Sequence, residues 1–245
     1  MVPVLEGRIA RRILLNWWLD PEAARRLVPE PFEPAIVNGF AVGGICLIRL
    51  EQMRPAGMPA ALGISSENMA HRIAVRYPSG DGWRDGVYIW RRDTGSLINT
   101  LLGGRVFPGV HRDAEFQVAE EESGLSLDVL SCDGATDVRL RALTGVAWKW
   151  SLLFPRLTDA ASFFERGSRG FSCRLDGRGV EGMELRQKHW EMSPLAVQDL
   201  HSAFFEDEKR FPRGSAGFDS AALLRGIPHT WHEISEMPEL AGAAR

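Results

Sequence analysis

A histidine follows a sharp corner in the segment GGRVFPGVHRDAEF, which runs from Gly103 to Phe116. Two adjacent glycines and a Phe-Pro-Gly triplet predict a turn, and His111 comes shortly after it. An imidazole has an unperturbed pKa of about 6.5, so it can transfer protons at neutral pH. The corner could serve only to reverse the chain. It could also present His111 to a substrate, and we therefore take His111 as a candidate catalytic residue.

The segment NMAHRIAVRY has the alternating pattern of a β-strand, in which successive side chains point to opposite faces. One face carries His71 and Tyr77 among apolar neighbours, and the other carries Asn68, Arg72 and Arg76. If the even-numbered face lines a pocket, its three polar residues could bind an anionic group. If the odd-numbered face does, the histidine and the tyrosine reach the pocket and the arginines face solvent. The sequence leaves both arrangements open.

The segment GFSCRLDGRGVEGMELRQKHWEM predicts a hairpin about its DGRG turn. His189, near the end of the second strand, shares a face with Gln187 and Glu191. It is either a hydrogen-bonded structural histidine or a residue that binds a substrate. We include His189 among the candidate substrate-binding residues.

Standard motifs for nucleotide, metal or acyl chemistry are absent from the sequence. His229 and His232, in the run HTWHE, would point to opposite faces of a strand because an odd spacing reverses the side. One metal ion could not easily bind both. We expect no metal site and no cofactor.

The composition is that of an ordinary globular protein, with 44% hydrophobic and 25% charged residues among 245. A net charge of -3 argues against a binder of nucleic acid or of membrane surfaces, which needs a basic stripe. There is no apolar run of about 20 residues, as a membrane span requires, and the first residues lead us to expect no signal peptide. Three widely separated cysteines predict no disulfide framework, and Cys46 is expected in the core. We expect a cytoplasmic protein.

The order of predicted elements indicates a mostly β protein with about nine or ten strands and three or four short helices. Asp20 is a good helix N-cap and Pro21 suits the first helical position, with prolines ending that helix after about two turns. Short helices are also predicted for Ser96 to Leu102, for LTDAASFFERG and for SPLAVQDLHSAFFED, and HTWHEI is predicted as a last short strand.

We predict a single domain over residues 1–245, with a core from about 7 to 235 and a loose tail at 236–245. The absence of a βαβ rhythm favours a strongly bent sheet or a barrel. Unpaired edge strands make a homo-oligomer plausible.

Several segments resemble a known family. LDPEAARRLVPEPFEP resembles the start of the acetoacetate decarboxylase-like superfamily. NMAHRIAVRY, GVYIWRRDTGS, RQKHWEMSPL and FDSAALLRGIPHTWH resemble its uncharacterised YqjF-like branch. The resemblance covers most of Gly7 to Glu233. It implies a mainly β (α+β) single domain, built as a bent, cone-shaped antiparallel β-barrel with a few short helices and an interior small-molecule pocket.

In the decarboxylases that this chain resembles, a pocket lysine forms a Schiff base with a β-keto acid, beside a second lysine. That lysine pair directly follows an aromatic-proline dipeptide. Here the matching dipeptide is Phe107-Pro108, and Gly109 and Val110 follow it. The chain's lysines are at positions that match no family lysine: Lys149, Lys188 and Lys209. Schiff-base decarboxylation is therefore not expected.

The resemblance also points to two charged residues. Glu67 lies near the position of the family's glutamate, so it joins His111 as a candidate catalytic residue. Arg11 lies near the position of the family's arginine, so it joins the candidate substrate-binding residues.

Two functions remain open. The first is a lyase, isomerase or hydratase that acts on a small oxo- or hydroxy-carboxylate without an imine, with an arginine binding the anion and His111 or Glu67 moving protons. The second is a non-catalytic protein that binds a hydrophobic carboxylate. Both need a small-molecule partner, and neither needs nucleic acid or a membrane. The enzyme needs His111 and a carboxylate close together in a pocket, whereas the binding protein needs an apolar cavity with one polar end.

Overall fold

The computed structural model describes residues 3–96, 110–174, 176–235 and 238. Its helices are α1 (Pro21–Arg25), α3 (Leu157–Arg166) and the 3-10 helix η1 (Ala60–Leu62). Its strands are β1 (Leu5–Leu19), β2 (Glu33–Pro34), β3 (Ile36–Val37), β4 (Phe40–Pro55), β5 (Ile64–Ser79), β6 (Gly82–Thr94), β7 (His111–Glu120), β8 (Gly124–Ser131), β9 (Asp137–Leu143), β10 (Arg169–Cys173), β11 (Val180–Gln187), β12 (Ser193–Pro194), β13 (Ala196–Ser202) and β14 (Ala216–Glu233). The predicted helix after Ser96, the Phe107-Pro108 corner and the predicted tail (apart from Pro238) lie outside the described residues.

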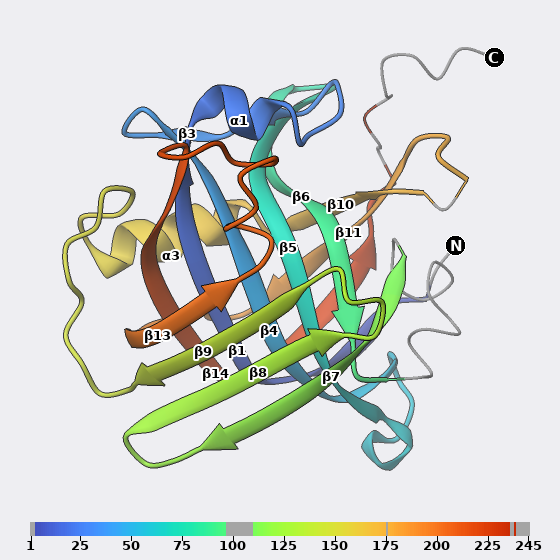
Figure 1. Cartoon of the computed structure of the whole chain (residues 1–245). Helices are drawn as coiled ribbons and strands as arrows, with labels where there is room; N and C mark the ends of the chain where they lie inside the picture. Colours follow the sequence, from blue (N-terminus) through green and yellow to red (C-terminus); the bar gives the residue numbers. More distant parts are fainter. Residues whose placement is uncertain (1–2, 97–109, 175, 236–237, 239–245) are drawn as a thin grey trace.

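Seven of these strands pair in a closed ring. Their order is β6–β10–β11–β14–β1–β4–β5, and β5 pairs with β6 to complete the circle. The β6–β10 and β6–β7 pairings are parallel and the other pairings antiparallel, so the sheet is mixed. Figure 1 shows the long strands curving around a common interior. The predicted fold, mainly β and bent into a barrel-like form, is confirmed.

A smaller sheet, β7–β8–β9–β13, continues from β6 and covers one outer face of the ring (Figure 1). Its apolar side chains, such as Leu127 and Leu140, are buried together with Ile13, Leu15 and Ile73 of the ring strands. Burying one such side chain stabilises the fold by roughly 1.5–3 kcal/mol. On β1 and β5, the residues that build the core between the two sheets are odd-numbered, from Ile13 to Leu19 on β1 and from Met69 to Tyr77 on β5.

The intervening residues of the ring strands point inward. Leu14 and Ala74 belong to a second buried cluster, in which they are joined by Leu224 and by Phe164 of α3. Helix α3 thus contributes an aromatic side chain to the interior of the ring. Because successive side chains of a strand point to opposite faces, the long ring strands contribute to two separate cores.

Local signals at the first helix are confirmed. The Asp20 carboxylate accepts a hydrogen bond from the Ala23 backbone N–H at 2.9 Å, and Pro21 opens the helix. The helix ends at Arg25, earlier than the two predicted turns. None of the helices in the described part of the chain is long and apolar enough to cross a membrane.

One local prediction near the C-terminus was wrong. The segment SPLAVQDLHSAFFED forms β12 and β13 rather than a helix, because β13 pairs with β9 from Ala196 opposite Leu143 to Ser202 opposite Val138. Pairing with a neighbouring strand outweighs the helical pattern of the isolated segment. The strand predicted for HTWHEI is confirmed, but it is the end of a longer strand, β14, which runs for 18 residues.

Gly44 is needed where three ring strands lie closest. It sits on β4 between Asn16 of β1 and Arg72 of β5. A Cβ atom here would lie 2.3 Å from the Leu15 carbonyl oxygen and 3.2 Å from the Arg72 Nη2. We expect Gly44→Ala to lower the free energy of unfolding by about 2 kcal/mol, because overpacking a tight core forces the backbone to move. Urea denaturation measures the change.

Gly80 is the matched control for this substitution. It lies between β5 and β6, and a Cβ added there meets nothing within 4 Å. Gly80→Ala should therefore leave the unfolding midpoint nearly unchanged. Equal losses in the two variants would contradict the steric argument.

Candidate functional site

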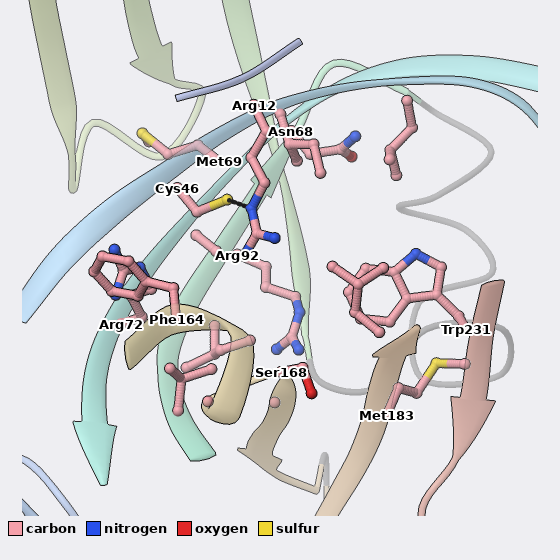
Figure 2. A pocket seen from close by; sticks show the side chains of 18 of the residues that line it. Arg12, Cys46, Asn68, Met69, Arg72, Arg92, Phe164, Ser168, Met183 and Trp231 are labelled. Carbon is pink, nitrogen blue, oxygen red and sulfur yellow. Dashed lines mark hydrogen bonds between the residues drawn. The ribbon is translucent and has the colours of Figure 1, made fainter. Parts of the chain in front are cut away.

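The interior of the ring contains a cavity with a volume of about 130 Å³. Most of its wall is apolar, with side chains from the ring strands and α3 such as Ile48, Leu50, Val87, Ile89, Phe164, Met183, Leu185 and Trp231. Its polar lining includes Arg12, Cys46, Asn68, Arg72, Arg92, Asp93, His111 and Ser168. Figure 2 shows two of the arginines reaching inward from different strands. A mostly apolar cavity with a few convergent polar groups is typical of a small-molecule site.

Arg72 is a buried cation in the wall of this cavity, with 4% of its surface exposed. Its Nη2 donates to the Asn16 Oδ1 at 2.8 Å, and its guanidinium lies 4.6 Å from the centre of the Phe164 ring. Its Nε and Nη1 have no hydrogen-bond partner among the described residues. Burial lowers the pKa of Arg72 to about 10. The side chain is therefore still charged at neutral pH.

Arg12 and Arg92 reach the same cavity from β1 and β6 (Figure 2). The Arg12 Nε donates to the Cys46 Sγ at 3.4 Å, and the Arg92 Nη1 donates to the Ser172 hydroxyl. Burial lowers the pKa of Arg92 to about 10, and the carboxylate of Glu181 opposes this shift. Within the described residues, no carboxylate comes within 4.0 Å of the charged nitrogens of any of the three cavity arginines.

Asn68, Asp93 and His111 also line the cavity. The Asn68 Oδ1 accepts a hydrogen bond from the Thr94 hydroxyl at 2.8 Å. His111 is the first residue of β7 and lies opposite Arg92 in the parallel β6–β7 pairing. The structure thus brings Asn68, Arg72 and His111 together from the set of candidate residues, and the even-numbered face of β5 is the one that turns inward.

Arg11 and Glu67 lie on the other face of the ring, towards the smaller sheet. The Arg11 guanidinium contacts Glu67 and Glu120, each at 2.6 Å, and Glu120 also pairs with Arg225 at 2.5 Å. Burial raises the pKa of Glu67 although Arg11 opposes it. Burial would also raise the pKa of Glu120, but hydrogen bonds from the two arginines hold it below its usual value. These residues form an ion-pair network outside the cavity lining.

Arg76 and His189 are exposed and do not line the cavity. The Arg76 guanidinium lies 5.3 Å from the centre of the Trp83 ring, where the β5–β6 hairpin extends beyond the ring. His189 follows the end of β11, and its backbone carbonyl accepts a hydrogen bond from the Gln187 side chain at 3.0 Å. Alternation gives Arg76 the same face as Arg72, but the curvature of the strand takes it away from the interior.

Sequence reasoning missed Arg12 and Arg92. Each is the second member of an arginine pair, and in each pair the two side chains point to opposite faces. The first members are ion-paired on the outer face: Arg11 with Glu67, and Arg91 with Asp93 at 2.7 Å. Two consecutive arginines within a predicted strand were therefore the sequence signal that could have identified Arg12 and Arg92.

Residues 7–216 match the family DUF2071, which is described as an uncharacterized conserved protein. The chain belongs to this family. Comparison with curated proteins gives no match. Among solved structures, this DUF2071 protein resembles acetoacetate decarboxylase from Legionella pneumophila, with a TM-score of 0.60 and 12% identity over 98% of this chain and 86% of that one.

Two further solved structures have the same fold. An acetoacetate decarboxylase-like enzyme from Sphingomonas wittichii RW1 matches with a TM-score of 0.59 and 13% identity, over 94% of this chain and 92% of that one. The enduracididine biosynthesis enzyme MppR, complexed with pyruvate, matches with a TM-score of 0.57 and 11% identity, over 95% and 89%. At these identities the likeness establishes an acetoacetate decarboxylase-like fold for this DUF2071 protein.

The inward direction of Arg72 sends His71 to the core between the sheets. The His71 side chain is completely buried, its ring lies 4.7 Å from that of Phe204, and neither ring nitrogen has a hydrogen-bond partner among the described residues. Burial lowers the pKa of His71 to about 3, and the nearby cations Arg91 and Arg210 act in the same direction. His71 is therefore a neutral core residue at physiological pH.

The burial of His71 as a neutral group predicts that the free energy of unfolding falls in mild acid. The pKa of His71 is about 6.5 when unfolded and about 3 when folded, so its contribution is present above pH 6.5 and is lost as the pH falls towards 3. One such group reduces the free energy of unfolding by up to about 1.4 kcal/mol per pH unit. We expect His71→Phe to reduce that slope between pH 6.5 and 5, as measured by urea denaturation. Exposed His189→Phe should keep the wild-type slope, and an unchanged slope in His71→Phe would contradict the assignment.

Proposed function

We propose that this protein binds a small carboxylate-bearing metabolite inside the ring of strands and acts on it as a lyase-type enzyme without a Schiff base. One observation carries the proposal. Three guanidinium groups, from Arg12, Arg72 and Arg92, line one small apolar cavity, and none has an ion-pair partner among the described carboxylates.

The energetics of buried charge support an anionic ligand. A charged group removed from water loses several kcal/mol of hydration energy unless a counter-charge replaces it. The Nε and Nη1 of Arg72 are buried without a hydrogen-bond partner among the described residues, so each has a donor left for an anion. A bound anion would supply hydrogen bonds and neutralise charge at once.

The size and lining of the cavity support a small ligand with an apolar part. A volume of about 130 Å³ is comparable with cavities that hold a benzene-sized molecule. MppR, which has the same fold, has been seen with pyruvate. We therefore choose pyruvate, a 2-oxo acid, as the probe for this site.

The distribution of lysines supports a reaction without an imine. All three lysines of the chain are exposed, and none lines the cavity: Lys149, Lys188 and Lys209. Proton transfer is then assigned to His111, which lines the cavity.

The anion-binding role predicts the effect of removing one guanidinium. Arg92→Met keeps an unbranched stem in place of the arginine stem and removes the charged guanidinium. Loss of a charge-assisted hydrogen bond costs about 1.5–3 kcal/mol, so the Kd for pyruvate should rise roughly 10-fold to 150-fold. Isothermal titration calorimetry measures the Kd.

Arg76→Met is the matched control, because Arg76 is exposed and lies outside the cavity lining. It should leave the Kd for pyruvate within about twofold of the wild-type value. The methyl ester of pyruvate, which lacks the charge, should bind weakly to every form. Equal affinities in the two arginine variants would contradict the proposed site.

The chemical role predicts exchange of the methyl protons of pyruvate with solvent deuterium, observed by proton NMR. His111→Gln should slow this exchange by about 100-fold, the lower range for loss of a general acid–base group.

Borohydride added with pyruvate should leave all three lysines unmodified in mass spectra. A stable lysine adduct would contradict the reaction without an imine. Pyruvate binding without any exchange would instead favour the non-catalytic binding protein, for which the apolar cavity wall is the supporting observation.

A further inference from the structure

We propose that Cys46 is a nucleophile in the ring cavity. Its thiol adds to the electrophilic carbon next to the carboxylate of a small 2-oxo acid. This inference rests on the proposed function, because the cavity arginines must first bind the carboxylate. It goes beyond anion binding by assigning a nucleophile and the position on the ligand that it attacks.

The position of Cys46 distinguishes it from the other two cysteines. Cys46 lies on the inner face of β4, where it lines the cavity and keeps 8% of its surface exposed. Cys132 is exposed outside the ring, and the Cys173 Sγ lies 3.1 Å from the Tyr88 hydroxyl oxygen. Cys46 is therefore the cysteine whose sulfur faces the site described above.

Two arginines line the cavity near this sulfur. The Arg12 Nε lies 3.4 Å from the Cys46 Sγ, and Figure 2 shows the contact at the cavity wall. Arg72 lines the same cavity, on β5 opposite Gly44, which lies two residues from Cys46 on β4. Arg72 supplies the independent sign of a ligand, since two of its guanidinium nitrogens are buried without a partner among the described residues.

The geometry sets which carbon reaches the sulfur. When Arg12 or Arg72 binds the carboxylate of a ligand, the carbon bonded to that carboxylate is held one covalent bond away from it. In the proposed complex this carbon lies beside the Cys46 Sγ. In a 2-oxo acid that carbon is the electrophilic carbonyl carbon. Holding two reacting groups side by side in this way gives effective concentrations far above those reached in solution.

The proposed step is an addition that needs no oxidant or reductant. The sulfur forms a bond to the carbonyl carbon, the π bond of the carbonyl breaks, and the thiol proton passes to the carbonyl oxygen. The product is a hemithioketal, which reverses by the same path. His111, on the same cavity, is the group available to carry the proton.

The test uses two alkylating reagents that differ in charge. Iodoacetate carries its electrophilic carbon next to a carboxylate, as a 2-oxo acid does, whereas iodoacetamide is neutral. In both reactions a carbon–sulfur bond forms, iodide leaves and the thiol proton goes to solvent. The native full-length protein is treated with each reagent, and mass spectrometry follows Cys46 and Cys132 separately.

We expect the ratio of iodoacetate rate to iodoacetamide rate to be at least about tenfold higher at Cys46 than at Cys132, because arginines attract the anionic reagent. Arg12→Met should bring the ratio at Cys46 down towards that of Cys132, and Arg76→Met should leave it unchanged. We prefer Arg12→Met to a substitution of Arg72, which is more deeply buried. Equal ratios at the two cysteines in the wild-type protein, or a Cys46 that reacts only after unfolding, would overturn the proposal.

A second measurement observes the adduct itself. With pyruvate labelled with carbon-13 at its carbonyl carbon, the wild-type protein and Cys132→Ser should both give a new NMR signal of a tetrahedral carbon, and Cys46→Ser should give none. The calorimetric titration separates the two proposals. If pyruvate binds the wild-type protein and Arg92→Met weakens it, but no adduct forms, only the assignment of Cys46 fails. If pyruvate does not bind, the proposed function fails.

Discussion

The charge placed inside the ring is the constraint on which the rest of the site depends. Three guanidinium groups enter an apolar interior that otherwise resembles a protein core. Part of their hydration is replaced by Asn16, by the Phe164 ring and by the Cys46 sulfur. These neutral groups cannot replace a counter-charge. The interior is thus apolar enough to hold a carbon skeleton and positive enough to select an anion.

Strand alternation explains how the chain carries so many arginines without placing all of them in one environment. Within a doubled arginine, one guanidinium turns outward to a carboxylate and the other turns inward to the cavity. On β1 the outward member is Arg11, which bridges Glu67 and Glu120 and so links the ring to the smaller sheet. On β6 the outward member is Arg91, which contacts Asp93 and Asp133. The same alternation therefore builds an outer face of ion pairs and an inner face whose arginines can bind an anion.

Much of the fold could be predicted from local signals and the family resemblance. Asp20 and Pro21 marked the first helix, and the alternating segment that contains Arg72 marked a central strand. The helix predicted for the segment that contains Ala196–Ser202 was wrong, because its strand partner is more than 50 residues away in the sequence. The cytoplasmic location and a homo-oligomer stay predictions. So do the catalytic roles of His111 and Glu67, although these two residues lie on different faces of the ring.

The sequence by itself determined the residue types, the two-residue period of the strands and the absence of lysine after the aromatic-proline corner, and these limit the chemistry that the chain can do. Only the tertiary structure decided which face of each strand is inside. Alternation places Arg72 and Arg76 on one face of the strand and His71 on the other, but it does not tell which of the two faces is inside. Ring closure through the β5–β6 pairing breaks this symmetry, because it gives every strand one concave and one convex side. Arg12, Arg72, Arg92 and Cys46 share one cavity for that reason, although they lie on four different strands.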